Sequence, residues 1–347
     1  MMKKLNFKSS LSNWLTYAGV IVAFVILFLM AEGGGMSSAL KGQLVPVCAY
    51  VVMALSLNLT VGVLGELSLG HAGFMSVGAF SGAVAAAALQ SVIPSDGLRL
   101  LVAMVIGALL AAVAGVIIGV PVLRLQGDYL AIVTLAFGEI IKSIVTNLYV
   151  GVDGKGLHIS FLNNTLQMDG GKMIMNGPMG IPANNKISTF LAGFILIMVT
   201  LVVIFNLVRS RSGRAIMALR DNRIAAESVG INVTKYKLMA FVISAALAGA
   251  AGTLFGLSQN TIVATKFDFN TSILVLVFVV LGGLGRMWGS IIAAAALTVL
   301  PELLREFSEY RMLIYAIVLI LVMLATNNPT IKGFFARIFK RKGAENE

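Results

Sequence analysis

Residues 209–237 read RSRSGRAIMALRDNRIAAESVGINVTKYK, and this basic stretch between two long apolar runs decides how the chain is arranged. It carries seven Lys or Arg residues against two acids, Asp221 and Glu227. A short basic loop between membrane spans is retained in the cytoplasm. Its middle, 213–229, is rich in helix formers, and Gly230 marks an end. We therefore expect a cytoplasmic helix at 213–229 that a partner inside the cell can bind.

The composition indicates a membrane protein. The 347 residues are 58% hydrophobic and 12% charged, and a soluble domain has about twice that charged fraction. The net charge of +11 comes mainly from basic residues in short loops, so it indicates membrane orientation and not nucleic-acid binding. With Cys48 as the only cysteine and two histidines, we expect no disulfide within the chain, no metal site and no cofactor.

Ten apolar segments predict an all-α, polytopic bundle in one transmembrane domain over 1–347. The first follows three lysines and is long for a signal peptide, so we interpret it as a retained span. Several segments are shorter than the roughly 20 residues of a full crossing. The pair at 270–285 and 287–300 is also compatible with one kinked or re-entrant unit. The expected spans are 14–30, 44–64, 71–90, 99–120, 128–149, 188–208, 238–257, 270–285, 287–300 and 312–326.

Charge predicts the orientation of these spans. With the N-terminus inside, ten crossings return the C-terminus to the cytoplasm, and 17 of the 26 Lys and Arg residues then lie inside against eight outside. This is the bias expected of cytoplasmic loops. The Gly- and Asn-rich stretch 151–186 becomes an external loop, either a connector or a docking surface, and 209–237 a cytoplasmic one.

Glycine pairs four residues apart are expected at helix–helix contacts, because small residues let helices approach closely. They occur at Gly78/Gly82, Gly115/Gly119, Gly252/Gly256 and Gly285/Gly289.

The segment from Gly62 to Gly73, GVLGELSLGHAG, interrupts the hydrophobic pattern. Broken helices in transporters expose backbone groups to a cavity, where they can hold substrate or line its path. The same residues are also compatible with a tight cytoplasmic turn that places Glu66 and His71 in water. The candidate path residues here are Gly65, Glu66, Ser68, Gly70 and His71.

The span that begins at Asp128 carries a polar stripe. Asp128 and Glu139 share a helical face, and Lys142 falls close to it. Ionisable groups within a span usually face a bundle interior or a water-filled path. Glu139 and Lys142 are three residues apart and can pair, so we interpret them first as a structural ion pair. Together with Thr134, these residues complete the candidate path.

No G-x-x-x-x-G-K-[ST] sequence occurs, so the chain has no P-loop for ATP. No Ser-His-Asp spacing or set of paired metal ligands stands out either. We expect a transport protein and not an enzyme.

Four motifs then resemble, in order, those of a permease subunit of a branched-chain amino acid ABC importer, of the LivM type. The most specific is GRAIMALRDNRIAAESVGINVTKYKLMAFVISAALAGAAG at 213–252. The others lie at 55–79, at 125–134 with the following LAFGEI, and at 281–289, LGGLGRMWG. The resemblance covers nearly the whole chain.

The resemblance implies an ABC importer permease with inverted repeats in a bacterial inner membrane, its transport path shared with a sibling permease. It implies two cytoplasmic ATP-binding subunits and an external substrate-binding protein as further partners. The E-A-A-x-x-x-G loop of many such permeases is kept in frame, without its Glu. The expected ATPase-coupling residues are Arg214, Met217, Leu219, Arg220, Ala225, Ala226 and Gly230.

Two alternative functions remain open. Close relatives of this family import urea or other small amides, and the four motifs do not separate them from amino-acid permeases. A secondary transporter could use Glu139 and Lys142 as an ion-coupling site, but it gives the helix at 213–229 no task.

Overall fold

The computed structural model describes residues 2–33, 35–90, 92–125, 127–153, 156–161, 171–182 and 186–304, with single positions at 313, 316, 317 and 320. The chain forms two compact units, 1–295 and 296–347. The helix bundle and the sheet belong to the first unit, and one helix extends across the boundary.

Within the described residues, seven helices are long and apolar enough to cross a membrane. The predicted pair at 270–285 and 287–300 forms two shorter apolar helices, α10 (Phe269–Gly282) and α11 (Met287–Leu303). They are separated by a break at 283–286, and the span expected at 312–326 lies mostly outside the described residues. The seven are α1 (Met2–Glu32), α2 (Ser38–Asn58) with the π-helical turn η1 (Leu59–Leu64), α3 (His71–Ala88), α4 (Asp96–Val122), α5 (Asp128–Thr146), α6 (Phe190–Arg209) and α9 (Val233–Gly256).

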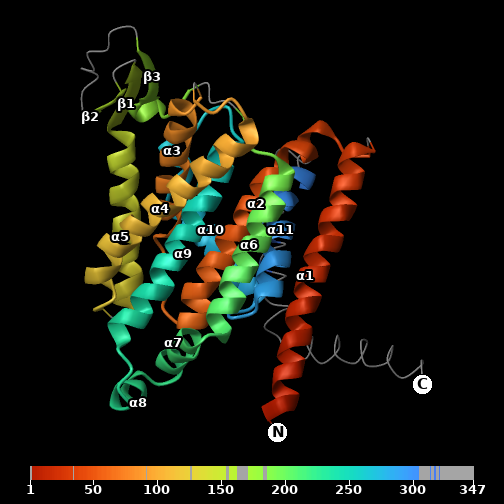
Figure 1. Ribbon diagram of the computed structural model, residues 1–347, viewed down its shortest axis with the longest axis vertical. Coiled ribbons are helices and arrows are strands. Elements are labelled where there is room, and N and C mark those ends of the chain that lie inside the picture. Colours follow the sequence, from red (N-terminus) through yellow and green to blue (C-terminus); the bar gives the residue numbers. More distant parts are fainter. Residues whose placement is uncertain are drawn as a thin grey trace. The chain divides into compact units, whose positions relative to one another are not determined.

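Helices α3, α4 and α9 pack on one another through small residues (Figure 1). A side chain at Gly78 would collide with the backbone of Gly249, and one at Gly107 with the Thr253 hydroxyl. That hydroxyl donates to the Gly78 carbonyl at 2.8 Å. The predicted role of the first three glycine pairs in helix packing is confirmed, because each glycine of those pairs faces a neighbouring helix at contact distance.

Helix α1 packs against α6 through aromatic side chains. Phe24 stacks on Phe194 and Phe190 with ring centroids 4.1 and 4.9 Å apart, and Tyr17 meets Phe205 edge-on. Much of the rest of α1 is exposed apolar surface, as expected of a helix that faces lipid.

The expectation of an all-α fold is wrong in one place, because part of the predicted external loop forms an antiparallel sheet. Its order is β2-β1-β3, with β1 at Leu148–Asp153, β2 at Gly156–Phe161 and β3 at Lys172–Asn176. The span expected at 128–149 therefore ends early, at Thr146. The reason lies in LYVGV, where the β-branched and aromatic residues favour a strand.

The sheet is followed by a 3-10 turn, η2 (Gly177–Met179), and then by Ile181. Ile181 exchanges two backbone hydrogen bonds with Ile262, at 2.9 and 3.1 Å. Ile262 precedes the 3-10 turn η3 (Ala264–Phe267), so this bridge joins the segment after the sheet to the residues just before α10. Two short helices, α7 (Arg211–Asp221) and α8 (Arg223–Ser228), lie between α6 and α9 in the chain. In Figure 1 the sheet lies at the opposite end of the bundle from α7 and α8.

Replacing Gly78 with Ala should destabilise the protein, because the added methyl group meets the Gly249 backbone and the helices must separate. Overpacking of this kind costs about 1–3 kcal/mol. Gly42→Ala is the matched control, because a Cβ at Gly42 on α2 meets nothing within 4 Å. Thermal unfolding of the purified protein measures the difference. Equal midpoints for the two variants would contradict the packing described.

Candidate functional site

The helix formed by α2 and η1 is broken before α3. Gly65 takes the left-handed conformation with φ 81°, and 65–70 is irregular up to His71. Gly65 is exposed, but Ser68 and His71 are each only 1% exposed. Gly70 packs against the backbone of Thr134 and Gly138 on α5. The segment is therefore not a turn that leaves His71 in water, because its second half is buried against α5.

Buried side chains satisfy backbone N–H groups at this break. The Thr134 hydroxyl accepts from the Leu69 N–H at 3.0 Å, and the Ser272 hydroxyl on α10 accepts from the Ala72 N–H at 3.1 Å. The Ala72 N–H is one of the first donors of α3, which have no partner inside the helix, and the Leu69 N–H lies in the irregular segment before it. A buried N–H without a partner is costly, so both bonds stabilise the break. The break is thus held from α5 and from α10.

His71 is bound inside the bundle. Its Nε2 lies 2.7 Å from the Ser56 hydroxyl on α2, and that hydroxyl donates to the Met53 carbonyl at 2.8 Å. A hydroxyl has one proton to donate, so the imidazole is the donor in the contact with Ser56. This bond ties the first residue of α3 to α2.

Glu66 forms an ion pair with Lys237 in the first turns of α9. The side chain of Lys237 is 5% exposed and that of Glu66 16%. A buried pair of this kind is costly to break, because removal of one partner strands the other charge. The exposed beginning of the break is therefore anchored to α9.

A second break, at 283–286 between α10 and α11, lies against the first. The buried Asn58 amide accepts from the Gly285 N–H at 2.8 Å and donates to the Ser290 hydroxyl at 2.9 Å. Gly62 packs directly on Gly285, and a side chain at Gly62 would collide with it. Both breaks thus share one set of contacts at the end of α2.

On α5, the predicted pair of Glu139 and Lys142 is confirmed, with an N···O distance of 3.0 Å. The carboxylate also accepts from the Phe269 N–H at the start of α10, at 3.2 Å. The side chains of Glu139 and Lys142 are 45% and 26% exposed, and Asp128 is also exposed. One face of α5 therefore presents charged groups outside the packed interior, while Thr134 faces inward.

A narrow crevice with no room for a water molecule lies where α3, α5 and α10 come together, and Leu69, Gly138 and Glu139 line it. Asp268 lines it too and caps α10, accepting from the Thr271 N–H at 3.0 Å. Partial burial raises the pKa of Asp268, but the bonds from Thr271 and Asn270 and the charge of Lys142 together hold it below its usual value. The carboxylate of Asp268 therefore adds a negative charge beside the Glu139 pair.

The predicted single helix at 213–229 is two helices, α7 (Arg211–Asp221) and α8 (Arg223–Ser228). Asn222 separates them, because its extended backbone ends α7 and its side chain accepts from the Ala225 N–H as the N-cap of α8. Gly230, with φ 85°, then turns the chain toward α9.

The predicted coupling residues lie on both sides of these helices. Leu219 and Ala226 are buried within the chain, at 5% and 4% exposure. Arg214 and Ala225 are exposed, Met217 is half-buried, and Arg220 turns its guanidinium toward Gly62. The sequence prediction did not include Ile224 and Val229, which are 80% and 75% exposed. The available sequence signal was weak, because Ile224 and Val229 are two of several large apolar residues in the segment 209–237.

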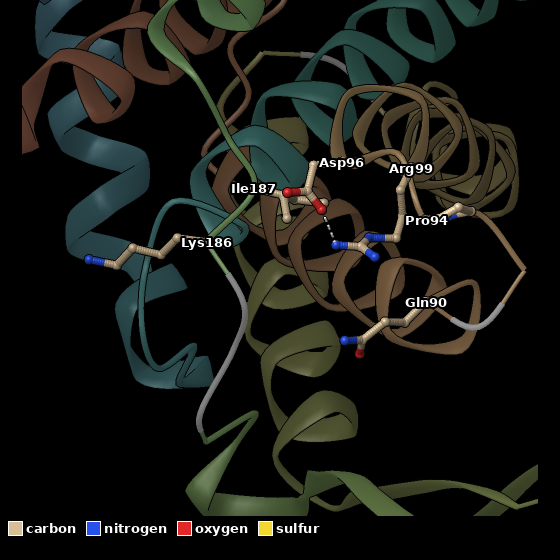
Figure 2. A pocket seen from close by; sticks show the side chains of 6 residues that line it. All are labelled: Gln90, Pro94, Asp96, Arg99, Lys186 and Ile187. Atoms are coloured by element: carbon tan, nitrogen blue, oxygen red, sulfur yellow. Dashed lines mark hydrogen bonds and ion pairs between the residues drawn. The ribbon is translucent and has the colours of Figure 1, made fainter.

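An open hollow of about 540 Å³ lies between the start of α4 and the segment before α6 (Figure 2). Figure 2 shows the Arg99 guanidinium directed at Asp96, whereas Lys186 points away from that pair. The side chain of Arg99 is 7% exposed and that of Asp96 67%. The hollow contains none of the predicted site residues.

Residues 39–323 match the family model described as the permease component of branched-chain amino acid transport systems. The high-affinity branched-chain amino acid transport system permease proteins LivM of Salmonella typhimurium and Escherichia coli are each 38% identical over 79% of this chain and 66% of their own length. The ribose import permease protein RbsC of Haemophilus influenzae is 29% identical over 80% of the chain and 79% of its length. No solved structure matches the chain.

Removal of the Lys237 charge should lower stability strongly. Lys237→Met leaves the Glu66 carboxylate unpaired in a largely buried position, at an expected cost of about 3–5 kcal/mol. Adding Glu66→Gln should recover much of the loss, because no charge is then stranded. Lys235→Met, at an exposed lysine two residues earlier, is the control. The assignment fails if thermal unfolding shows the same midpoint for Lys237→Met and Lys235→Met.

Proposed function

The chain belongs to the family of permease components of branched-chain amino acid transport systems, and we propose that it is the membrane-spanning subunit of an ATP-driven importer of leucine, isoleucine and valine. The family match over 39–323 carries this proposal. The chain spans 66% of the length of its LivM relatives, and it lacks a P-loop. The subunit is a transport component and not an enzyme, and ATP is hydrolysed by two partner subunits in the cytoplasm.

The transport path runs along the charged face of α5, between this subunit and a sibling permease. A charged side chain on a span does not face lipid without a large cost. The side chain of Glu139 is 45% exposed, so water or another subunit must contact this face of α5. The break at 65–70 and the start of α10 adjoin this face through the crevice that contains Leu69, Glu139 and Asp268. Gly65, Glu66, Ser68, Gly70, His71, Asp128, Thr134, Glu139 and Lys142 belong to the path or support it.

The ATPase docks on the exposed side of α7 and α8. Ile224 and Val229 offer apolar anchors for a groove, in the manner of a helix that inserts one face into a partner. Arg214, Met217 and Ala225 border them, and Gly230 sets the direction of the chain after α8. Leu219 and Ala226 act from the inside, where they hold the two helices against the bundle.

The chain is a multi-pass membrane protein, and ten spans with both termini in the cytoplasm account best for its charge distribution. The N-terminal end of α1 lies at the same end of the bundle as α7 and α8 (Figure 1), which supports this orientation. The pairs α2–α3 and α9–α10 are partners in an inverted repeat. In support, α3 packs on α9 and α10 packs on α2. Accessibility of tags at Lys3 and Lys340 in sealed cells checks the orientation.

Replacing Ile224 with Asp should weaken ATPase binding, because a charge replaces an apolar anchor that nothing else in the described chain covers. We expect co-purification of the ATPase to fall about tenfold or more, the loss expected for an interface anchor. Thr234→Asp places the same charge on an exposed site at the start of α9 and is the control. Equal ATPase recovery from both variants would show that α8 is not part of the interface with the ATPase.

Uptake by the complete transporter in liposomes tests the proposed substrate. We expect ATP-dependent uptake of labelled leucine with a matching external binding protein, and no uptake of labelled urea. A sodium or proton gradient without ATP should give none, because the pairing of Glu139 with Lys142 and with the Phe269 N–H gives that carboxylate a structural role. Urea uptake without leucine uptake would indicate the amide branch of the family. Gradient-driven uptake without the ATPase would indicate a secondary transporter.

A further inference from the structure

We propose that Arg220 is the positioning residue that transmits movement of α7 to the transport path, by holding the carbonyl of Gly62 at the helix break. This inference rests on the proposed function, since it assumes that a partner ATPase moves α7. It assigns Arg220 a role inside the permease and not on the docking surface.

The contact joins parts of the chain 158 residues apart. Arg220 Nη1 donates to the Gly62 carbonyl at 2.9 Å. Gly62 lies near the end of η1, where carbonyl groups have no N–H donor within the helix, and a basic side chain is well suited to supply one. Because its donor is charged, this bond is stronger than an ordinary backbone bond. Arg220 thus acts as a C-terminal cap supplied by another helix.

The backbone at the break at 65–70 leaves room for the side chain of Arg220. A Cβ at Gly65 would collide with the Arg220 stem, and Gly65 has φ 81°, so a glycine both forms the turn and leaves room for the stem. Asp221 accepts from Nε and Nη2 of the same guanidinium, at 3.2 and 3.1 Å. A planar guanidinium can hold both partners at once, which an ammonium group cannot do in the same geometry.

The carbonyl that Arg220 holds lies where the two breaks meet. Gly62 packs on Gly285, and Asn58, one turn earlier, accepts from the Gly285 N–H at 2.8 Å. A displacement of α7 therefore reaches both 65–70 and 283–286 through atoms in contact. Lys237, paired with Glu66, ties the same break to α9, which follows the coupling helices directly in the chain.

Arg220 and the docking residues lie on different parts of the coupling segment. Arg220 ends α7 with a side chain that is 42% exposed and bonded inward, whereas Ile224 projects from α8 at 80% exposure. Loss of Arg220 should therefore leave the ATPase bound, but movement of the ATPase should no longer be transmitted to the transport path.

The test measures uptake per ATP hydrolysed by the complete transporter in liposomes, alongside recovery of the ATPase on purification. Arg220→Ala should keep ATPase recovery and ATP hydrolysis, while uptake per ATP falls about tenfold, the size expected for loss of one charge-assisted hydrogen bond. Arg220→Lys keeps the charge but cannot hold both partners, so a fall of about two- to fivefold is expected. Lys235→Ala removes an exposed positive charge from the same loop and should change nothing.

An unchanged ratio of uptake to hydrolysis in Arg220→Ala would overturn the inference. Loss of the ATPase from that variant would also overturn it, by showing that Arg220 is a docking residue. If Arg220→Ala is recovered in poor yield, Arg220→Lys decides, because a wild-type ratio in that variant contradicts the inference. Failure of the proposed function is distinguishable, since the unmodified complex would then show no ATP-dependent uptake.

Discussion

The need to satisfy backbone polar groups away from water governs this structure. Within a bilayer, irregular backbone is tolerated only where protein or a water-filled cavity meets its N–H and C=O groups. The chain breaks its helices at 65–70 and at 283–286, and side chains from elsewhere supply the missing partners. Thr134, Ser272 and Asn58 accept from N–H groups, and Arg220 donates to a carbonyl. These four contacts bring α5, α10, α2 and α7 to one place.

The segment 209–237 has an exposed side and a side that is bound to the bundle. On the exposed side, Ile224 and Val229 are the large apolar side chains that we propose contact a partner. The inner side, with Leu219 and Ala226 buried and Arg220 bonded to Gly62, holds the segment to the bundle. A segment that was attached to the bundle only through the spans on either side of it could move without displacing the breaks at 65–70 and 283–286. Here the attachment is direct, so in the proposed mechanism a movement of α7 acts on the backbone where the helices are interrupted.

Local features were predictable from the sequence, and long-range partners were not. The interruption at 62–73 and the ion pair of Glu139 with Lys142 follow from glycine content and helical spacing. The partners of the break, such as Lys237 for Glu66 and Ser272 for Ala72, lie 171 and 200 residues away, and no periodicity relates them. The division at Asn222 was missed because its capping side chain outweighed the helix formers around it. The sheet was missed because composition suggested only a loop.

Hydrogen exchange at the two breaks, measured on the complete transporter with and without ATP turnover, tests the central claim most directly. In the resting state the amides of Leu69, Ala72 and Gly285 should be protected, because each donates to a side-chain oxygen. During turnover, peptides from 62–73 and 283–290 should exchange faster together, since both breaks share contacts with Gly62 and Asn58. Fast exchange at rest, or exchange that ATP leaves unchanged at both breaks, would contradict the account.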